Sequence, residues 1–150
     1  TIKSESYLLE IHKLSPDIVV TGEACPMWVS LVENNEYQSE GADYFVKQHI
    51  NRLLDKDPMI DTIILGCTHY PLLLDKIRQF TPGHIRIIAQ GEYVARSLQD
   101  YSNRHPEMDA RCEKGGKCRF LTTESENKLE ESASIFLGRQ DIIVESIALE

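Results

Sequence analysis

A thiol and an imidazole, Cys67 and His69, lie two positions apart at the point of the sequence where residue types and spacing best suggest reaction chemistry. The β-branched run Thr62–Leu65 precedes them and predicts a buried strand of a parallel sheet. Pro71 predicts the first turn of a helix, with Thr68 as its N-cap. Cys67 is therefore expected between the carboxyl end of a strand and the positive end of a helix dipole, where a thiolate is favoured. His69 would exchange protons in the same turn.

Three candidate residues also have a purely structural interpretation. Cysteine is among the most buried residue types, so packing explains Cys67 as well as reactivity does. Cys25 follows another predicted strand, but Pro26 accounts for the turn there, and we interpret Cys25 as a core residue. Glu33 ends an apolar helix and, judged alone, is a solvated carboxylate. Residue types and spacing leave both alternatives open for Cys67.

Two further cysteines, Cys112 and Cys118, frame a Gly-Gly turn. The alternatives for them are a local disulfide, half of a metal site, or two reduced thiols. His105 is the only further ligand nearby, so a structural zinc site is not expected and two reduced loop thiols are favoured. The sequence also lacks a P-loop and the glycine pattern of a dinucleotide-binding turn, so it does not support nucleotide binding.

Length, charge and composition limit the classes of protein to which the sequence can belong. A chain of 150 residues fits one domain, or one domain plus part of another. Its 16 Lys and Arg against 24 Asp and Glu give a net charge of −8, which argues against nucleic acid or an acidic membrane as a partner. No apolar run approaches the roughly 20 residues of a membrane span, and no signal-peptide pattern heads the chain, so a cytoplasmic protein is expected. The first residue is Thr1 rather than Met, which suggests an excised fragment.

Hydrophobic periodicity predicts strands that alternate with helices. Strands are expected at residues 17–21, 62–65, 85–89, 120–123 and 142–144. Helices are expected over residues 7–14, 27–32, 40–54, 71–80 and 125–137, with a further helix after a turn at residues 90–92. This alternation is typical of an α/β fold with a doubly wound parallel sheet and helices on both faces. Residues 101–116 lose the periodicity and are the best candidate for a domain boundary or a crossing loop.

The segment Leu65–Leu73, LGCTHYPLL, resembles the signature around the second catalytic cysteine of the glutamate racemases, in the aspartate/glutamate racemase superfamily. Further matches flank this segment in the same order as in that family. They are Thr1-Ile2-Lys3-Ser4 with Tyr7, Ala24-Cys25-Pro26 leading to Leu31-Val32-Glu33, Gln90-Gly91-Glu92 after a strand, and Phe120–Thr123 before a helix that ends in Phe136-Leu137-Gly138. The chain is similar to the carboxyl-terminal part of such a racemase over essentially its whole length, except in the loop at residues 101–117.

The resemblance implies a racemase that uses neither a cofactor nor a metal and has two α/β domains facing each other across a cleft. Each domain gives one cysteine to opposite faces of the substrate α-carbon. Cys67 matches the cysteine that deprotonates L-glutamate, and His69 matches the imidazole that tunes this cysteine. Glu33 matches the acid that pairs with the histidine, and Thr68 and Thr1 match substrate contacts. A positioned base, a partner acid and donors for the developing charge are what removal of a weakly acidic α-proton requires.

The family's first catalytic cysteine and its amino-terminal Asp-Ser segment have no counterpart in this sequence. By resemblance, residues 1–90 form the carboxyl-terminal catalytic domain, and residues 91–150 belong to the segment that completes the missing amino-terminal domain. The parent enzyme would interconvert L- and D-glutamate and supply D-glutamate for bacterial peptidoglycan in the cell wall. This chain alone is expected to be inactive.

The expected partner is a small molecule, glutamate, and the oligomeric state is open, with a homodimer as one alternative. Other functions also stay open. Aspartate racemases typically carry glutamate at the position of His69, so this histidine favours a glutamate racemase. A Cys-His thiol hydrolase or transferase, and a noncatalytic α/β interaction domain, are the alternatives from other classes.

Overall fold

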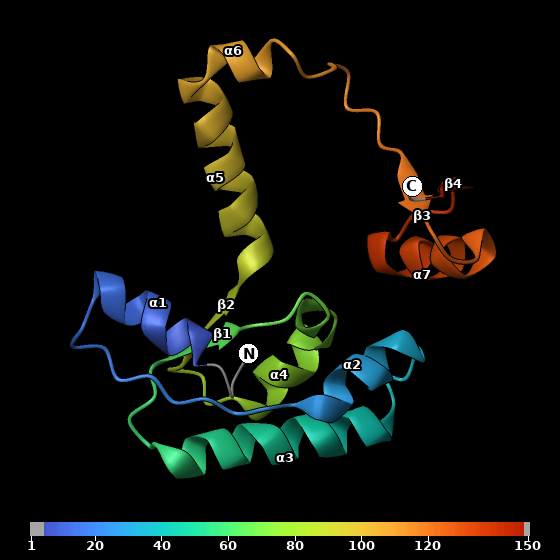
Figure 1. Ribbon diagram of the computed structural model, residues 1–150. Coiled ribbons are helices and arrows are strands. Elements are labelled where there is room, and N and C mark those ends of the chain that lie inside the picture. The colour runs from blue at the N-terminus through green and yellow to red at the C-terminus, as the bar shows by residue number, and fades with distance from the viewer. Residues whose placement is uncertain (1–4, 149–150) are drawn as a thin grey trace. The chain divides into compact units, whose positions relative to one another are not determined.

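The computed structural model describes residues 5–148, which form helices and two pairs of parallel strands (Figure 1). The predicted α/β class is confirmed. The chain divides into two compact units, one ending at Tyr93 and the other beginning at Val94. Each unit contains one pair of parallel strands.

The first unit contains most of the regular structure. Its elements are α1 (Ser6–Leu14), α2 (Pro26–Glu33), α3 (Glu40–Lys56), β1 (Thr62–Leu65), the 3₁₀ helix η1 (Tyr70–Leu73), α4 (Leu74–Phe80) and β2 (Arg86–Ala89). The helix α5 (Gln90–Arg104) begins directly after β2. The predicted turn at residues 90–92 is therefore wrong, because the helix starts there without an intervening loop.

Helix α3 shows how the sequence shapes this unit. The Ser39 side chain caps it by accepting a hydrogen bond from the amide of Ala42 (3.2 Å), and acidic residues in the first turn suit the helix dipole. Ala42, Val46 and Ile50 form its buried stripe at helical spacing. Helix α3 packs against α2 and α4, so the three helices share one core.

The parallel pair β1 and β2 is in register from Thr62 with Arg86 to Leu65 with Ala89. Ile63 and Leu65 are buried, whereas Ile64 between them is 43% exposed. The strand predicted at residues 62–65 is thus formed, but it is buried on one face only. Both strands end at the same edge of the sheet, where Cys67 follows β1.

The strand predicted at residues 17–21 is not formed, and these residues have no regular structure. The amide of Ile18 donates to the Ser15 carbonyl in a turn (3.3 Å), and the Ile18 carbonyl lies 2.9 Å from His12 Nε2. Val19 is 80% exposed. A β-branched sequence forms a strand only where a neighbouring strand supplies ladder hydrogen bonds, and residues 17–21 make none of these bonds in the structure.

The second unit contains the rest of α5, then α6 (Pro106–Asp109), β3 (Phe120–Thr122), α7 (Glu126–Leu137) and β4 (Val144–Ser146). Helix α7 connects the parallel strands β3 and β4 and ends at Gly138, whose φ of 62° lies in the left-handed region that glycine tolerates. A small core of Ala133, Ile142 and Val144 joins these elements. The last strand begins two residues later than predicted, and residues 101–104, predicted as loop, extend α5.

Within residues 5–148, no helix combines the length and apolar character needed to cross a membrane.

Candidate active site

Cys67 lies two residues beyond the end of β1, and the half-buried side chains of Cys67 and His69 meet in the turn that follows. The Cys67 Sγ is 3.7 Å from Nδ1 of His69. The amide of Tyr70 donates to the Cys67 carbonyl (3.3 Å), which closes the turn through the backbone. The thiol and the imidazole therefore face each other within reach of proton transfer.

Glu33, at the last position of α2, lies on the other side of the same imidazole. Its Oε1 is 3.4 Å from His69 Nε2, although the Glu33 side chain is 61% exposed. Glu33 lies at ion-pair distance from Nε2, so its carboxylate can stabilise a positive charge on the imidazole, while Nδ1 faces Cys67. The expectation that Glu33 lies within hydrogen-bond reach of His69 is confirmed. The result is a contact series from thiol to imidazole to carboxylate.

Of the two threonines in the candidate set, Thr68 does not join this contact series. Thr68 is exposed and does not cap a helix, so its predicted N-cap role is wrong. The reason is that the chain enters η1 through backbone bonds, with the Leu72 amide donating to the His69 carbonyl (3.1 Å). The Thr68 hydroxyl is thereby left available to another partner. Thr1 lies outside the described residues.

Tyr7, on α1, contacts the turn from a distant part of the sequence. A Cβ placed on Gly66 would lie 3.3 Å from the Tyr7 ring, so the ring packs directly on this glycine. The Tyr7 hydroxyl accepts a hydrogen bond from Gln90 Nε2 (2.6 Å). Gly66 and Gln90 follow the carboxyl ends of β1 and β2, so Tyr7 bridges the edge of the sheet where ligands of α/β proteins collect. The sequence analysis identified Tyr7 only as part of the family resemblance and did not predict this contact.

Cys25 occupies a different environment. It is 9% exposed, and its Sγ lies 3.8 Å from the Glu23 carbonyl. Burial, and secondarily the negative charge of Glu23, raise the pKa of the Cys25 thiol to about 12. The interpretation of Cys25 as a core residue is confirmed.

The chain is similar in sequence to curated glutamate racemases. The chain is 33% identical over 150 residues to glutamate racemase 1 of Caldanaerobacter subterraneus subsp. tengcongensis and 36% identical over 149 residues to glutamate racemase of Streptococcus suis. These alignments cover 100% and 99% of the chain and 55% of each relative. The chain thus spans about half the length of the relatives it matches. A comparison with protein-family models found no match.

Solved structures lead to the same family. Glutamate racemase isoform RacE1 from Bacillus anthracis superposes with a TM-score of 0.88 at 34% identity, over 99% of this chain and 54% of that one. The enzyme from Francisella tularensis, solved in complex with D-glutamate, superposes with a TM-score of 0.85 at 25% identity, over 100% of this chain and 55% of that one. The chain is a relative of the glutamate racemases. The similarity predicted from the LGCTHYPLL segment is confirmed.

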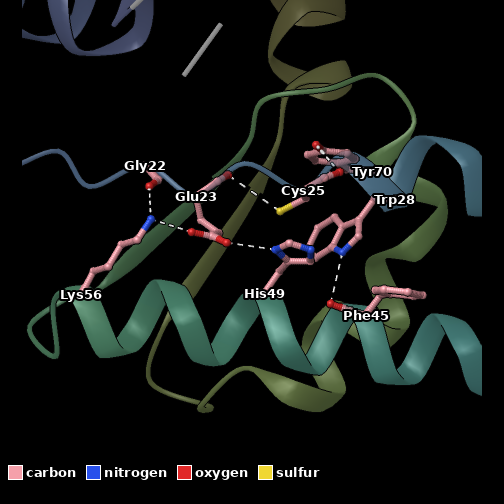
Figure 2. Close-up of polar contacts among 8 residues, drawn as sticks. All are labelled: Gly22, Glu23, Cys25, Trp28, Phe45, His49, Lys56 and Tyr70. Atoms are coloured by element: carbon pink, nitrogen blue, oxygen red, sulfur yellow. Dashed lines mark hydrogen bonds and ion pairs between the residues drawn. The ribbon is translucent and has the colours of Figure 1, made fainter. Parts of the chain in front are cut away.

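A polar cluster in the first unit joins the buried His49, the largely buried Glu23 and the half-exposed Lys56 (Figure 2). Glu23 Oε1 is 3.0 Å from His49 Nδ1, and Lys56 Nζ donates to Glu23 Oε2 (2.5 Å) and to the Gly22 carbonyl (2.8 Å). Burial opposes ionisation of Glu23, but the bonds from Lys56 and His49 outweigh it and hold the pKa of the carboxyl below its usual 4.5. Sequence reasoning missed this cluster because its members are 26 and 33 residues apart and share no motif.

The two remaining cysteines of the chain, Cys112 and Cys118, are both exposed. All four cysteines are free thiols, so the alternative of a local disulfide in the 112–118 loop is wrong. Across the part of the chain that the structure describes, no group of three or more His, Cys, Asp or Glu side chains is arranged to hold a metal ion.

Proposed function

We propose that this chain supplies one of the two catalytic thiols of a glutamate racemase, with Cys67 as the base that removes the α-proton of L-glutamate. The observation that carries the proposal is the contact series from Cys67 through His69 to Glu33, in a chain related over its whole length to glutamate racemases. The Francisella tularensis relative was solved with D-glutamate, which supports glutamate as the substrate here.

The geometry suggests how the base is prepared. His69 Nδ1 takes the proton of the Cys67 thiol, and the Glu33 carboxylate stabilises the resulting imidazolium at Nε2. The Cys67 thiolate then removes the α-proton of the substrate, and negative charge develops on the substrate carboxylate. Hydrogen-bond donors must stabilise that charge, and we assign the exposed Thr68 hydroxyl to this contact. Thr1 is proposed as a second substrate contact by resemblance alone.

Inversion at the α-carbon needs a proton donor on the opposite face, and we propose that a second cysteine in the other half of the enzyme supplies it. Cys25 does not suit this role, because it is buried and its thiol ionises only at a pKa of about 12. No cofactor takes part in the proposed proton transfers. Residues 91–150 would complete the other domain, and the chain alone would be inactive. The whole enzyme would be cytoplasmic and provide D-glutamate for peptidoglycan.

The test is racemisation with and without the missing half. Purified chain is incubated with D-glutamate in deuterium oxide, alone and then with a polypeptide corresponding to the amino-terminal part of a relative. Circular dichroism and deuterium incorporation at the α-carbon are followed. We expect activity only with both parts, lost in Cys67→Ser and retained in the matched control Cys112→Ser. Sustained racemisation by the chain alone would refute the two-domain, two-thiol mechanism.

The contact between Cys67 and His69 also favours a second candidate, a thiol hydrolase, because a histidine-activated cysteine can form an acyl-enzyme. Incubation with a chromogenic ester and intact-mass measurement distinguish the two. An acyl adduct that forms on Cys67 and is then hydrolysed would support the hydrolase, whereas a racemase requires α-proton exchange without a covalent adduct.

A further inference from the structure

The polar cluster in the first unit fixes a buried histidine of α3. His49 is 4% exposed, and its Nδ1 contacts Glu23 in the segment that precedes α2. Lys56, about two helix turns further along α3, binds the other oxygen of the same carboxylate. Both Glu23 oxygens therefore have partners, and a buried pair of this kind is costly to break because it leaves an uncompensated charge. The cluster ties the start of α2 to α3.

Trp28 connects this cluster to the candidate active site, because its ring contacts both His49 and Tyr70. Figure 2 shows its indole between the His49 imidazole and the Tyr70 ring. It meets His49 edge-on at 6.1 Å between ring centroids and Tyr70 at 4.9 Å, and its Nε1 donates to the Phe45 carbonyl (3.5 Å). With 2% of its surface exposed, Trp28 is held on several sides. Such edge-to-face contacts fix ring orientation in addition to burying area.

Tyr70 completes the connection, because it is the residue directly after His69. Its ring packs on Trp28, and its hydroxyl donates to the carbonyl of Cys25, at the amino-terminal end of α2 (3.4 Å). The other end of α2 carries Glu33, which contacts His69 (3.4 Å). Helix α2 therefore meets the reactive turn at two points, a packed one at its start and a polar one at its end.

We propose that Trp28, fixed by the Glu23–His49 pair, is a positioning residue that sets α2 against η1 so that Glu33 reaches His69. This inference rests on the proposed function, in which Glu33 orients the imidazole that activates Cys67. Glu33 needs such positioning because its side chain is mostly exposed and its 3.4 Å contact is near the outer limit of a hydrogen bond. A contact of this length is lost if the end of α2 moves away from His69 by about 1 Å.

The test follows the alkylation of Cys67 by iodoacetamide as a function of pH, in the chain as given, with each cysteine resolved by peptide mass spectrometry. Trp28→Phe keeps an aromatic ring but removes the indole donor and part of the contact area. We expect it to slow alkylation of Cys67 at pH 7 by roughly three- to tenfold and to move the midpoint of the profile to higher pH. Glu33→Gln should act in the same direction. When Glu33→Gln is already present, adding Trp28→Phe should slow the alkylation of Cys67 by less than a further twofold.

Ile50→Val is the matched control, because it truncates a buried side chain of α3 one position after His49 and should leave the Cys67 profile unchanged. Glu23→Gln tests the same connection from its other end and keeps the size of the side chain. Its effect on Cys67 should likewise disappear in the Glu33→Gln background. Thermal unfolding confirms that each variant is folded at the assay temperature.

The outcomes separate this inference from the proposed function. Equal effects of Trp28→Phe in the presence and absence of Glu33 would overturn the positioning role while leaving Cys67, His69 and Glu33 as the site. A Glu33→Gln variant with an unchanged Cys67 profile would overturn the role of Glu33 and the positioning role with it. An effect of Ile50→Val as large as that of Trp28→Phe would show general loosening of the core and would also overturn the inference.

Discussion

Cys25 and Cys67 stand in similar local sequences and in opposite chemical environments. Each follows an apolar β-branched segment, and each precedes a proline that opens a helix, at Pro26 or Pro71. Cys25 directly precedes its proline and is the buried residue at the start of α2, whereas three residues separate Cys67 from its proline and form a turn. The longer turn gives room for His69 beside the thiol.

The partners of the two thiols explain the difference in reactivity that we expect. Burial, and secondarily the negative charge of Glu23, raise the pKa of the Cys25 thiol to about 12. Cys67 is half-buried and faces an imidazole that a carboxylate contacts from behind. A thiolate is stabilised by a neighbouring cation and opposed by burial and negative charge. Position after a strand is therefore not sufficient to make a cysteine reactive.

The largest expected effect is the difference in alkylation rate between the two thiols. At pH 8 a thiol with a pKa of about 12 is ionised in about one molecule in ten thousand, and Cys25 is also shielded from solvent. We expect iodoacetamide to label Cys67 more than 100 times faster than Cys25. Peptide mass spectrometry after limiting labelling measures both sites.

The exposed loop thiols, Cys112 and Cys118, are internal references in the same experiment. Cys67 should react faster than either, despite being less exposed. Preferential labelling of Cys112 or Cys118 in the folded chain would count against the assignment of Cys67 to the active site.

The next effect concerns the stability of the Cys25 region. Glu23→Gln removes the charge that pairs with His49 and Lys56, and we expect it to lower the free energy of unfolding at pH 7 by about 1–3 kcal/mol. The folded pKa of Glu23 lies below its unfolded value of 4.5, so the pair contributes stability above that pH. This contribution is lost as pH falls through the folded pKa, where wild type and variant should converge.

Urea denaturation of both proteins at a series of pH values from 7 downward past 4.5 checks this dependence. Glu10→Gln is the matched control, because the exposed pair of Glu10 with Lys13 should contribute little at either pH. A constant difference between wild type and Glu23→Gln across this pH range would mean that packing, and not the ionised pair, stabilises the segment before α2.

The third expected effect is confined to the Cys67 region. His69→Gln removes the group that can accept the thiol proton, and we expect alkylation of Cys67 at pH 7 to fall about tenfold while that of Cys25 stays the same. His84→Gln, which changes an exposed histidine between α4 and β2, is the control. Equal slowing at both cysteines would indicate a general change in the fold and would remove the basis for assigning His69 as the partner of Cys67.

The sequence predicted those features of the two cysteine regions that depend on neighbouring residues, and it missed those that depend on residues far apart in the chain. The strand before Cys67, the proline-led helix after it and the burial of Cys25 follow from local patterns, and the structure contains them. Residues 17–21 have the same β-branched character as β1 but form no strand, because ladder partners are set by tertiary structure. The His49–Glu23 pair joins residues 26 positions apart, so no periodicity could reveal it.

Glu33 illustrates the same limit within the candidate site. Spacing alone describes an exposed carboxylate at a helix end, and its exposure in the structure agrees with that description. Its contact with His69 became an expectation only through the family resemblance. Tyr7 was part of that resemblance as well, but its packing on Gly66 depends on how α1 lies against the sheet edge and was not predicted.

The smallest expected effect tests whether the Cys67 turn is constrained more tightly than a loop elsewhere in the same unit. In Gly66→Ala the new Cβ would lie 3.3 Å from the Tyr7 ring, so the ring must move by a few tenths of an ångström. The backbone of Gly66 lies outside the left-handed region, so alanine adds no strain there and the contact alone sets the cost. We expect a loss of about 1 kcal/mol in the free energy of unfolding.

Gly83→Ala is the matched control, because nothing lies within 4 Å of a Cβ at that position, and its effect should be near zero. Adding Tyr7→Leu, which removes the ring from the contact, should make the Gly66→Ala change nearly neutral in a double-mutant cycle measured by urea denaturation. If Gly66→Ala costs the same with tyrosine or leucine at position 7, the ring does not constrain the turn. The alignment of Cys67 with His69 would then depend on η1 and α2 alone, and the α1 side of the site would be free to vary without loss of thiol reactivity.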